Sequence, residues 1–291
     1  MKSKNEKAYD AIPKSAMVKA YQYGKTVEIT DAPVTRQVIQ VMSGHRYKDL
    51  RSGVVKDMHR HSQTRSDNIK SIKATMAKLR RMIGANFHGG LNELWVTLTY
   101  GTLMRDTSIV YRDFKIFMQR VRRQAWGTSI EYLAVIEPQA SGSWHLHVLF
   151  KRTDKSRLYV PNSMMEQLWP HGFTSTKRLK QTDNVAAYLM AYLTDLVIDE
   201  QYIKGKKTKQ IAKGARLYLY PTHTRLYRCS RGIKQPIVEH DYKSKVLARN
   251  KIHHDADRRY KRSYQHDDRK ITITTEFYSL RKGEEGNEKN D

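Results

Sequence analysis

Two short apolar segments separated by a turn constrain the fold of this chain more than any other feature. IEYLAVIE (130–137) and WHLHVLF (144–150) are rich in β-branched, aliphatic and aromatic residues, which is typical of β-strands. The residues between them include a proline, a glycine and two serines, which favour a turn. The two segments therefore predict an antiparallel hairpin.

The second strand of this hairpin carries two histidines in an otherwise apolar run. Residues i and i+2 of a strand share a face, so His145 and His147 point the same way while the apolar residues between them face the core. If Glu137 pairs opposite His145, their Cβ atoms lie about 4.5–5.5 Å apart and one carboxylate meets two imidazoles. Two nitrogen ligands and one oxygen ligand leave positions open on a divalent ion, as a catalytic metal requires.

Other interpretations of these three residues stay open at this point. A slip of one residue in the strand register would send Glu137 to the opposite face of the sheet. His145 and His147 would then lie on an ordinary solvated face. Glu137 would be an ordinary carboxylate at a strand end, next to Pro138.

The rest of the pattern mixes short helices with strands. Apolar residues recur at spacings of three and four in the predicted helices, and alternate with polar residues or form β-branched runs in the predicted strands. We expect helices at 66–87, 111–126, 161–172 and 182–198, and strands at 25–30, 94–101, 130–137, 144–150, 173–179 and 270–280. Residues 239–270 are predicted to form an exposed basic helix or arm. This order favours an α+β fold with a mainly antiparallel sheet.

The net charge narrows the class of partner. Lysine and arginine number 54 against 29 acidic residues, which gives a formal charge of +25. Such a surface attracts polyanions, and nucleic acid is the default partner, although a ribosome-associated or merely basic protein has the same balance. The basic residues that we expect to contact DNA phosphates, rather than solvent alone, are Lys177, Arg178, Lys180, Arg120 and Arg123.

The compartment is predicted from what the sequence contains little of. No window approaches 18 apolar residues and the N-terminal segment has no apolar signal region, so we expect neither a membrane span nor a secretory leader. Cys229 is the only cysteine, which fits a reducing compartment. We expect a cytoplasmic protein.

Two tyrosines are the remaining candidate site. In AYLMAYL (187–193), Tyr188 and Tyr192 lie four residues apart on a predicted helix and are therefore neighbours on one face. Tyrosines at the edge of an apolar stripe also serve simply to pack, with their hydroxyls in water. The pair alone does not decide between the two roles.

Taken in order, these motifs resemble the HUH endonuclease superfamily, most closely the two-tyrosine rolling-circle replication initiators of bacterial plasmids and phages. LWVTLTY (94–100) resembles the first motif of that family, WHLHVLF (144–150) its metal motif and YLMAY (188–192) its nucleophile motif. LWPHGFTSTKRL and GARLYLYPTHTRLYRCSRGI, which flank the tyrosine segment, are similar to replication-associated proteins of this group. The resemblance covers about residues 66–236.

The resemblance implies a fold and a set of site residues. The fold would be a five-stranded antiparallel sheet of the split βαβ, ferredoxin-like type, flanked by helices. His145, His147 and Glu137 would hold a divalent metal, Mg²⁺ or Mn²⁺, and Tyr188 and Tyr192 would be the nucleophiles. The endonuclease domain would span residues 65–236, between an N-terminal extension (1–64) and a basic C-terminal arm with a disordered tail (237–291).

One position departs from the family pattern. The family often has a lysine three residues after each tyrosine, where this chain has Ala191 and Asp195. The positive charge that such a lysine brings to the phosphate must come from elsewhere. Lys204, Lys206 and Lys207 are sequence candidates for that role.

The expected activity follows from the resemblance. It is metal-dependent nicking and rejoining of single-stranded DNA, or of a hairpin origin, through a 5′-phosphotyrosine. No G-x-x-x-x-G-K-[ST] motif is present, so a separate helicase and a DNA polymerase of the host would be partners. The alternatives are a relaxase or transposase of the same superfamily, and a non-enzymatic nucleic-acid-binding protein.

Overall fold

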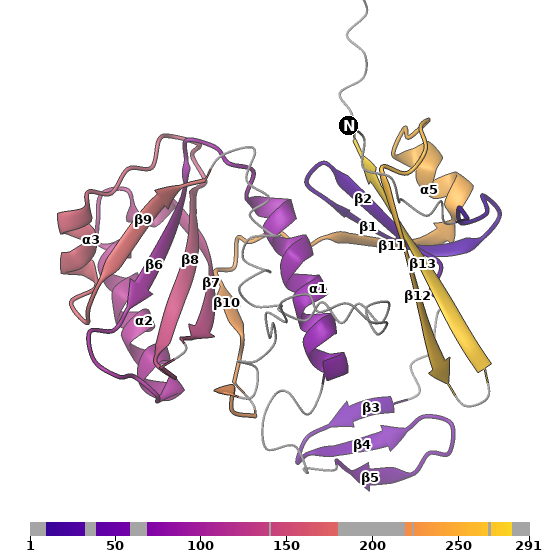
Figure 1. Ribbon diagram of the computed structural model, residues 1–291, viewed down its shortest axis with the longest axis horizontal. Helices are drawn as coiled ribbons and strands as arrows, with labels where there is room; N and C mark the ends of the chain where they lie inside the picture. The colour runs from indigo at the N-terminus through magenta and orange to yellow at the C-terminus, as the bar shows by residue number, and fades with distance from the viewer. Residues whose placement is uncertain are drawn as a thin grey trace, which may run out of the picture. The chain divides into compact units, whose positions relative to one another are not determined.

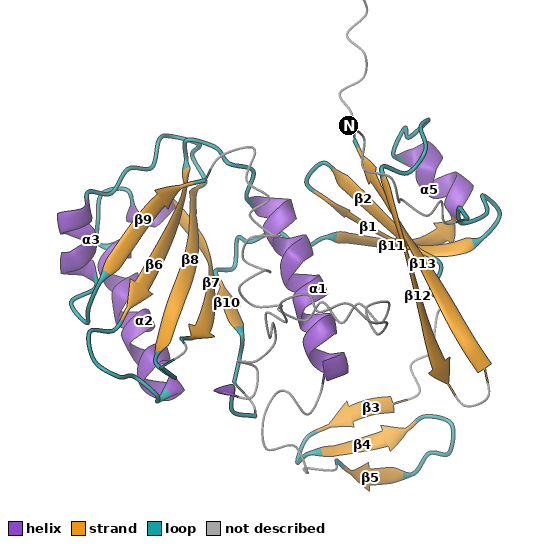
Figure 2. Ribbon diagram, viewed as in Figure 1, coloured by secondary structure: helices purple, strands orange, loops and turns teal. Residues whose placement is uncertain are grey.

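The computed structural model describes residues 10–32, 39–58, 69–139, 141–179, 219–222, 224–266 and 269–280. The chain divides into two compact units, which we call unit 1 (residues 1–60 with 236–291) and unit 2 (residues 61–235). Each unit has its own cluster of buried hydrophobic residues. The elements of both are shown in Figures 1 and 2.

Unit 2 is built on a five-stranded sheet in which all neighbouring strands are antiparallel. Its strands, in the order in which they lie in the sheet, are β10 (Tyr227–Cys229), β7 (Ile130–Pro138), β8 (Trp144–Arg152), β6 (Glu93–Thr99) and β9 (Thr174–Arg178). The predicted α+β class and antiparallel sheet are confirmed. The predicted hairpin is β7 and β8, at the middle of the sheet.

Helices cover the two faces of this sheet differently. On one face lies α2 (Thr107–Arg122), which begins where the Asp106 carboxylate accepts a hydrogen bond from the Ser108 amide. Its ring Phe117 packs 6.2 Å from Phe150 of β8, and α3 (Asn162–Leu168) lies on the same side. The face that carries the histidines meets α1 (Ile69–Asn86) near the far end of β8. There Lys151 donates a hydrogen bond to the Asn86 side chain at 2.8 Å. A single 3-10 turn, η2 (Gly127–Ser129), leads into β7.

Unit 1 contains a second five-stranded antiparallel sheet. Its strands, in sheet order, are β11 (Ile237–Tyr242), β1 (Met17–Tyr23), β2 (Thr26–Thr30), β13 (Arg269–Ser279) and β12 (Arg258–His266). Helix α5 (Lys243–Arg249) packs on one face through Val246, in a cluster with Val18 and Ile29. A separate small sheet is formed by β3 (Ile39–Met42), β4 (Arg46–Asp49) and β5 (Val55–Asp57).

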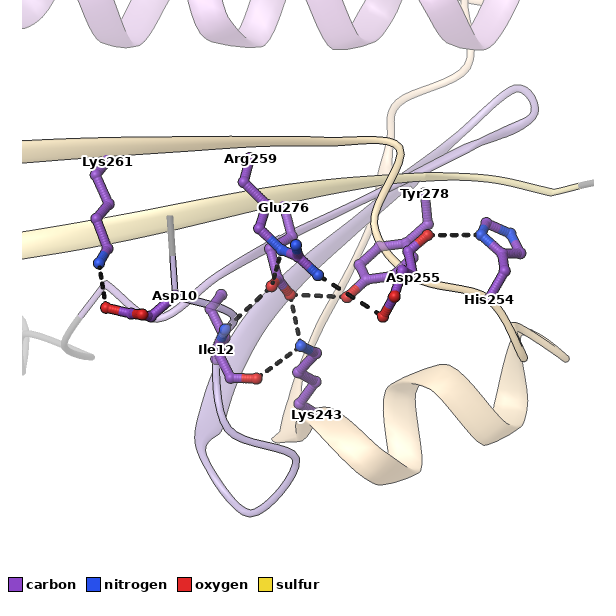
Figure 3. A network of polar contacts seen from close by, with 9 residues as sticks. All are labelled: Asp10, Ile12, Lys243, His254, Asp255, Arg259, Lys261, Glu276 and Tyr278. Atoms are coloured by element: carbon purple, nitrogen blue, oxygen red, sulfur yellow. Dashed lines mark hydrogen bonds and ion pairs between the residues drawn. The ribbon is translucent and has the colours of Figure 1, made fainter. Parts of the chain in front are cut away.

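A buried carboxylate ties the two ends of the chain together in unit 1 (Figure 3). Glu276 is fully buried, and its oxygens accept hydrogen bonds from Lys243 at 2.7 Å, Tyr278 at 2.7 Å and Arg259 at 3.1 Å. The backbone amide of Ile12 also donates to it, at 3.0 Å. Because a buried carboxylate without partners is costly, these contacts fix the N-terminal segment against β13.

This pairing joins segments that lie far apart in the sequence. Residues 239–270, expected as an exposed helix or arm, form most of β11, then α5 and β12, and β11 pairs with β1. The expected final strand is present as β13 and pairs with β2 and β12. The helix expected at 182–198 and the tail 281–291 lie outside the described residues.

Within the described part of the chain, no helix is both long enough and apolar enough to cross a membrane.

Candidate metal centre

The turn between β7 and β8 sets the register of the hairpin. The Gln139 amide donates to the Ser143 carbonyl at 2.7 Å, and the Gly142 amide donates to the Gln139 carbonyl at 2.9 Å. Gly142 has φ +81°, in the left-handed region that favours glycine. With the turn closed in this way, Glu137 lies opposite His145, which is the register that the metal-site hypothesis needs.

Glu137, His145 and His147 converge on a small volume. Glu137 Oε2 lies 2.8 Å from His147 Nε2 and 3.3 Å from His145 Nε2. The two imidazole rings have their centroids 4.8 Å apart. One ligand atom from each of the three residues lies within 4.8 Å of the other two. The prediction that these three side chains share one face and meet is confirmed.

The spacing and burial of these atoms fit a metal ion. Ligand atoms about 2.1 Å from a common ion and at right angles to each other lie about 3.0 Å apart, which is close to the two distances from Glu137 Oε2. Glu137 is 3% exposed and His147 6%. His145 Nε2 is buried and makes no hydrogen bond of good geometry to any described residue. A buried nitrogen lone pair without a hydrogen donor suits a metal ligand better than a purely hydrogen-bonded cluster.

A set of outer residues orients the imidazoles. The Thr97 hydroxyl lies 3.2 Å from His147 Nδ1, and the Trp95 indole N–H donates to the same nitrogen at 3.4 Å. The Gln139 side-chain amide lies 3.4 Å from His145 Nδ1. Partners on the second ring nitrogen hold a metal-ligating histidine in place, so this arrangement fits the same site.

The charge states also suit metal binding. Burial alone would raise the pKa of Glu137, but the neighbouring imidazoles of His145 and His147 outweigh burial and lower it to about 2. Burial lowers the pKa of His147 below its ordinary value, against the opposing effect of the Glu137 carboxylate. Near neutral pH, Glu137 is therefore ionised and His147 is neutral, which is the state in which each binds a cation.

Strand β9 brings one lysine to the face of the histidines. Lys177 pairs with Trp95, which lies beside His147, whereas Arg178 pairs with Leu94 of the opposite face. The positive charge of Lys177 contributes to the lowered pKa of His147. Lys177 is therefore the described basic residue that supplies charge to this site from the sheet itself.

The other predicted residues are placed elsewhere or lie outside the described residues. Arg120 and Arg123 are at the end of α2, on the opposite face of the sheet, and Arg120 donates to the Leu168 carbonyl at 3.1 Å. Lys180, Tyr188 and Tyr192 lie outside the described residues, as do Lys204, Lys206 and Lys207. Their roles stay predictions.

Sequence reasoning did not assign Trp95, Thr97 or Gln139 to the site. Alternation along β6 predicts that Trp95 and Thr97 share one face, but not that this face is the one of the histidines. That assignment needs the pairing of Thr97 with His147 across β6 and β8.

The comparisons with known proteins agree with this geometry. Residues 93–196 match the profile of a family described as replication-associated proteins of the ORF2 type. The match covers about a third of the 291 residues and includes Glu137, His145, His147 and the segment with Tyr188 and Tyr192. It supports a replication initiator of the Rep type. No curated protein and no solved structure matches the chain at a significant level.

Proposed function

We propose that the chain initiates rolling-circle replication by nicking and rejoining single-stranded DNA with two tyrosine nucleophiles. The observation that carries the proposal is the meeting of Glu137, His145 and His147 on one sheet face, within the matched segment. In this proposal the sheet of unit 2 and its helices are the split βαβ domain of an HUH endonuclease. The substrate is a single-stranded or hairpin origin, and the host supplies the helicase and the DNA polymerase.

Glu137, His145 and His147 would hold Mg²⁺ or Mn²⁺. When bound, such an ion polarises a scissile phosphate and stabilises the charge that develops on it. The chain's own contribution is to present three ligands that already converge, two of them with partners on their second ring nitrogen. The Lys177 ammonium adds positive charge to the same face and is proposed to contact the DNA phosphate.

The proposed reaction conserves the phosphodiester energy. The phenolic oxygen of Tyr188 or Tyr192 attacks the phosphorus, and the bond to the 3′ oxygen breaks. The phenol proton is lost to solvent and the 3′ oxygen gains a proton, which leaves a 5′-phosphotyrosine and a free 3′-hydroxyl. The reverse reaction rejoins the strand. A second tyrosine allows a second cleavage while the first DNA end stays attached.

A covalent-adduct assay tests the proposal. The full chain is incubated with a pool of random-sequence single-stranded DNA and Mn²⁺, denatured in detergent, and the protein that carries DNA is isolated and the DNA sequenced. We expect an adduct that EDTA abolishes. It should be lost in the double variant Tyr188→Phe with Tyr192→Phe, and reduced at least about 100-fold by Glu137→Gln.

A third tyrosine supplies the control. Tyr159 is 68% exposed and belongs to unit 2, so Tyr159→Phe removes one hydroxyl without touching the proposed site. This variant should form the adduct at the rate of the unaltered chain. An adduct that persists in the double variant would exclude the tyrosine assignment, and a chain that binds DNA reversibly with Mn²⁺ but never forms an adduct would leave the non-enzymatic binding protein.

A further inference from the structure

The sheet of unit 1 has one face that α5 does not cover. Val18, Ile29 and Tyr278 lie on the covered face, in one cluster with Val246 of α5. Residues at the alternate positions lie on the other face, which we call the outer face. Strand register aligns one row of it across all five strands, through His240, Lys19, Thr30, Thr275 and Tyr260.

Aromatic and apolar side chains of the outer face are exposed. Tyr260 is 51% exposed and Tyr242 is 45% exposed, with Met17 opposite Tyr242 at 51%. Tyr260 packs edge-on against Phe277, with the ring centroids 5.7 Å apart and an angle of 89° between the planes. This contact holds the Tyr260 ring in place while leaving about half of it accessible.

The outer face also concentrates basic residues. Lys19, His240, Arg258 and Arg262 occupy it, and none of these four forms an ion pair with a described residue. At the described positions of this face the one acidic residue is Glu28, which is 4% exposed and accepts a hydrogen bond from the Tyr23 hydroxyl. The exposed charge of the face is therefore positive.

The acidic residues of these strands lie on the other side. Glu239 and Asp241 of β11 point to the face of α5, where Arg249 binds them at 2.9 Å and 2.7 Å. Glu276 is buried on that face too, and Figure 3 shows Arg259 and Lys261 of β12 reaching to the same side. The covered face thus carries acids with partners, and the outer face carries basic residues and exposed rings, so the two faces are electrostatically different.

We propose that the outer face of unit 1 binds single-stranded DNA. Bases stack on Tyr260 and Tyr242, and the backbone phosphates contact Lys19, Arg258 and Arg262. Aromatic rings on an open sheet stack unpaired bases of any sequence, and basic residues between them follow the backbone. The choice of DNA as the strand rests on the proposed function, which produces a displaced single strand. The outer face then holds DNA that unit 2 has nicked.

A binding measurement with matched variants tests this proposal. The full chain is titrated into a fluorescent oligothymidine of about 15 nucleotides, within the range that one such module covers, in EDTA so that no cleavage contributes. We expect Tyr260→Ala to weaken binding at least about fivefold, because one stacked base is lost. Arg262→Gln should weaken binding and reduce the slope of log affinity against log salt by about 0.7.

The controls lie on the same strand. Tyr260→Phe keeps the ring and should bind within about twofold of the unaltered chain. Lys261→Gln removes one charge from the same strand, but Lys261 points to the α5 side, where it meets Asp10 at 3.1 Å. It should also bind within about twofold. If Tyr260→Ala and Arg262→Gln bind no more weakly than these two controls, the proposal is wrong.

Crosslinking locates the strand independently of affinity. With bromodeoxyuridine in the oligonucleotide, we expect photoadducts in peptides that contain Tyr242 or Tyr260. Adducts confined to residues 61–235 would overturn the proposal, whereas an absent nicking adduct in the separate covalent assay would overturn only the function proposed for unit 2.

Discussion

At the scale of the residue, His147 shows how the metal centre depends on a second partner for each imidazole. Because Glu137 is ionised, it can only accept from His147 Nε2, and the Trp95 indole then donates to Nδ1. A metal on Nε2 would require the proton on Nδ1. The Thr97 hydroxyl, 3.2 Å from Nδ1, is the group that can then accept it. Thr97 therefore matters in the metal-bound state.

Thr97→Val should weaken metal binding by about tenfold or more, since a partner on the second nitrogen typically contributes 10–100-fold in affinity. The change keeps the side-chain shape and removes only the hydroxyl. Titration of Mn²⁺ followed by electron paramagnetic resonance measures the affinity. Thr99→Val is the matched control, because Thr99 lies on the same strand and face, opposite His145, and makes no such contact with a described imidazole. Equal affinities for the two variants would remove Thr97 from the site.

At the scale of the element, β9 separates two adjacent charges. Lys177 shares the face of the histidines and Arg178 lies on the opposite face, although both are exposed. The alternation of a strand thus decides which positive charge can reach a phosphate at the metal centre.

Lys177→Gln should slow formation of the covalent DNA adduct by about tenfold or more, because it removes a charge that stabilises the reacting phosphate. Arg178→Gln changes the net charge equally and should slow the reaction less than about twofold. Adduct formation is measured at saturating DNA and Mn²⁺, so that weaker binding does not contribute. Equal slowing in both variants would show that only the overall charge matters.

The same strands show what the sequence could predict. The hairpin of β7 and β8 is local, so its turn residues and alternation were enough to place Glu137, His145 and His147 on one face. Thr97 and Lys177 reach that face from β6 and β9, and their placement depends on the order of strands in the sheet. The pairing of β1 with β11 joins residues more than 200 positions apart, and no turn or periodicity marks it.

At the scale of the whole molecule, the chain has two hydrophobic clusters with no member in common. Separate cores predict separate cooperative units. All four tryptophans, Trp95, Trp126, Trp144 and Trp169, belong to unit 2. Tryptophan fluorescence therefore reports the unfolding of unit 2, and hydrogen exchange of β13 reports that of unit 1.

Glu276→Gln should destabilise unit 1 by about 3–5 kcal/mol, because Lys243 is 4% exposed and loses its counter-charge. The exchange of β13 amides in increasing urea should report this loss, while the tryptophan transition stays unchanged. Glu239→Gln is the control, since the partly exposed pair of Glu239 with Arg249 contributes at most about 1 kcal/mol. A shift of both transitions by equal amounts would mean that the two units unfold together.

The pH dependence of that difference gives the sign of the interaction. Burial would raise the pKa of Glu276, but Lys243, Tyr278 and the Ile12 amide outweigh burial and hold the pKa below its ordinary value of 4.5. A carboxyl whose pKa is lowered on folding adds stability above the unfolded pKa, and this stability is lost as the pH falls through the folded pKa. The stability difference between the unaltered chain and Glu276→Gln should therefore be constant near neutral pH and shrink below about pH 4.5. A difference that grew on acidification would mean that the carboxylate does not stabilise unit 1.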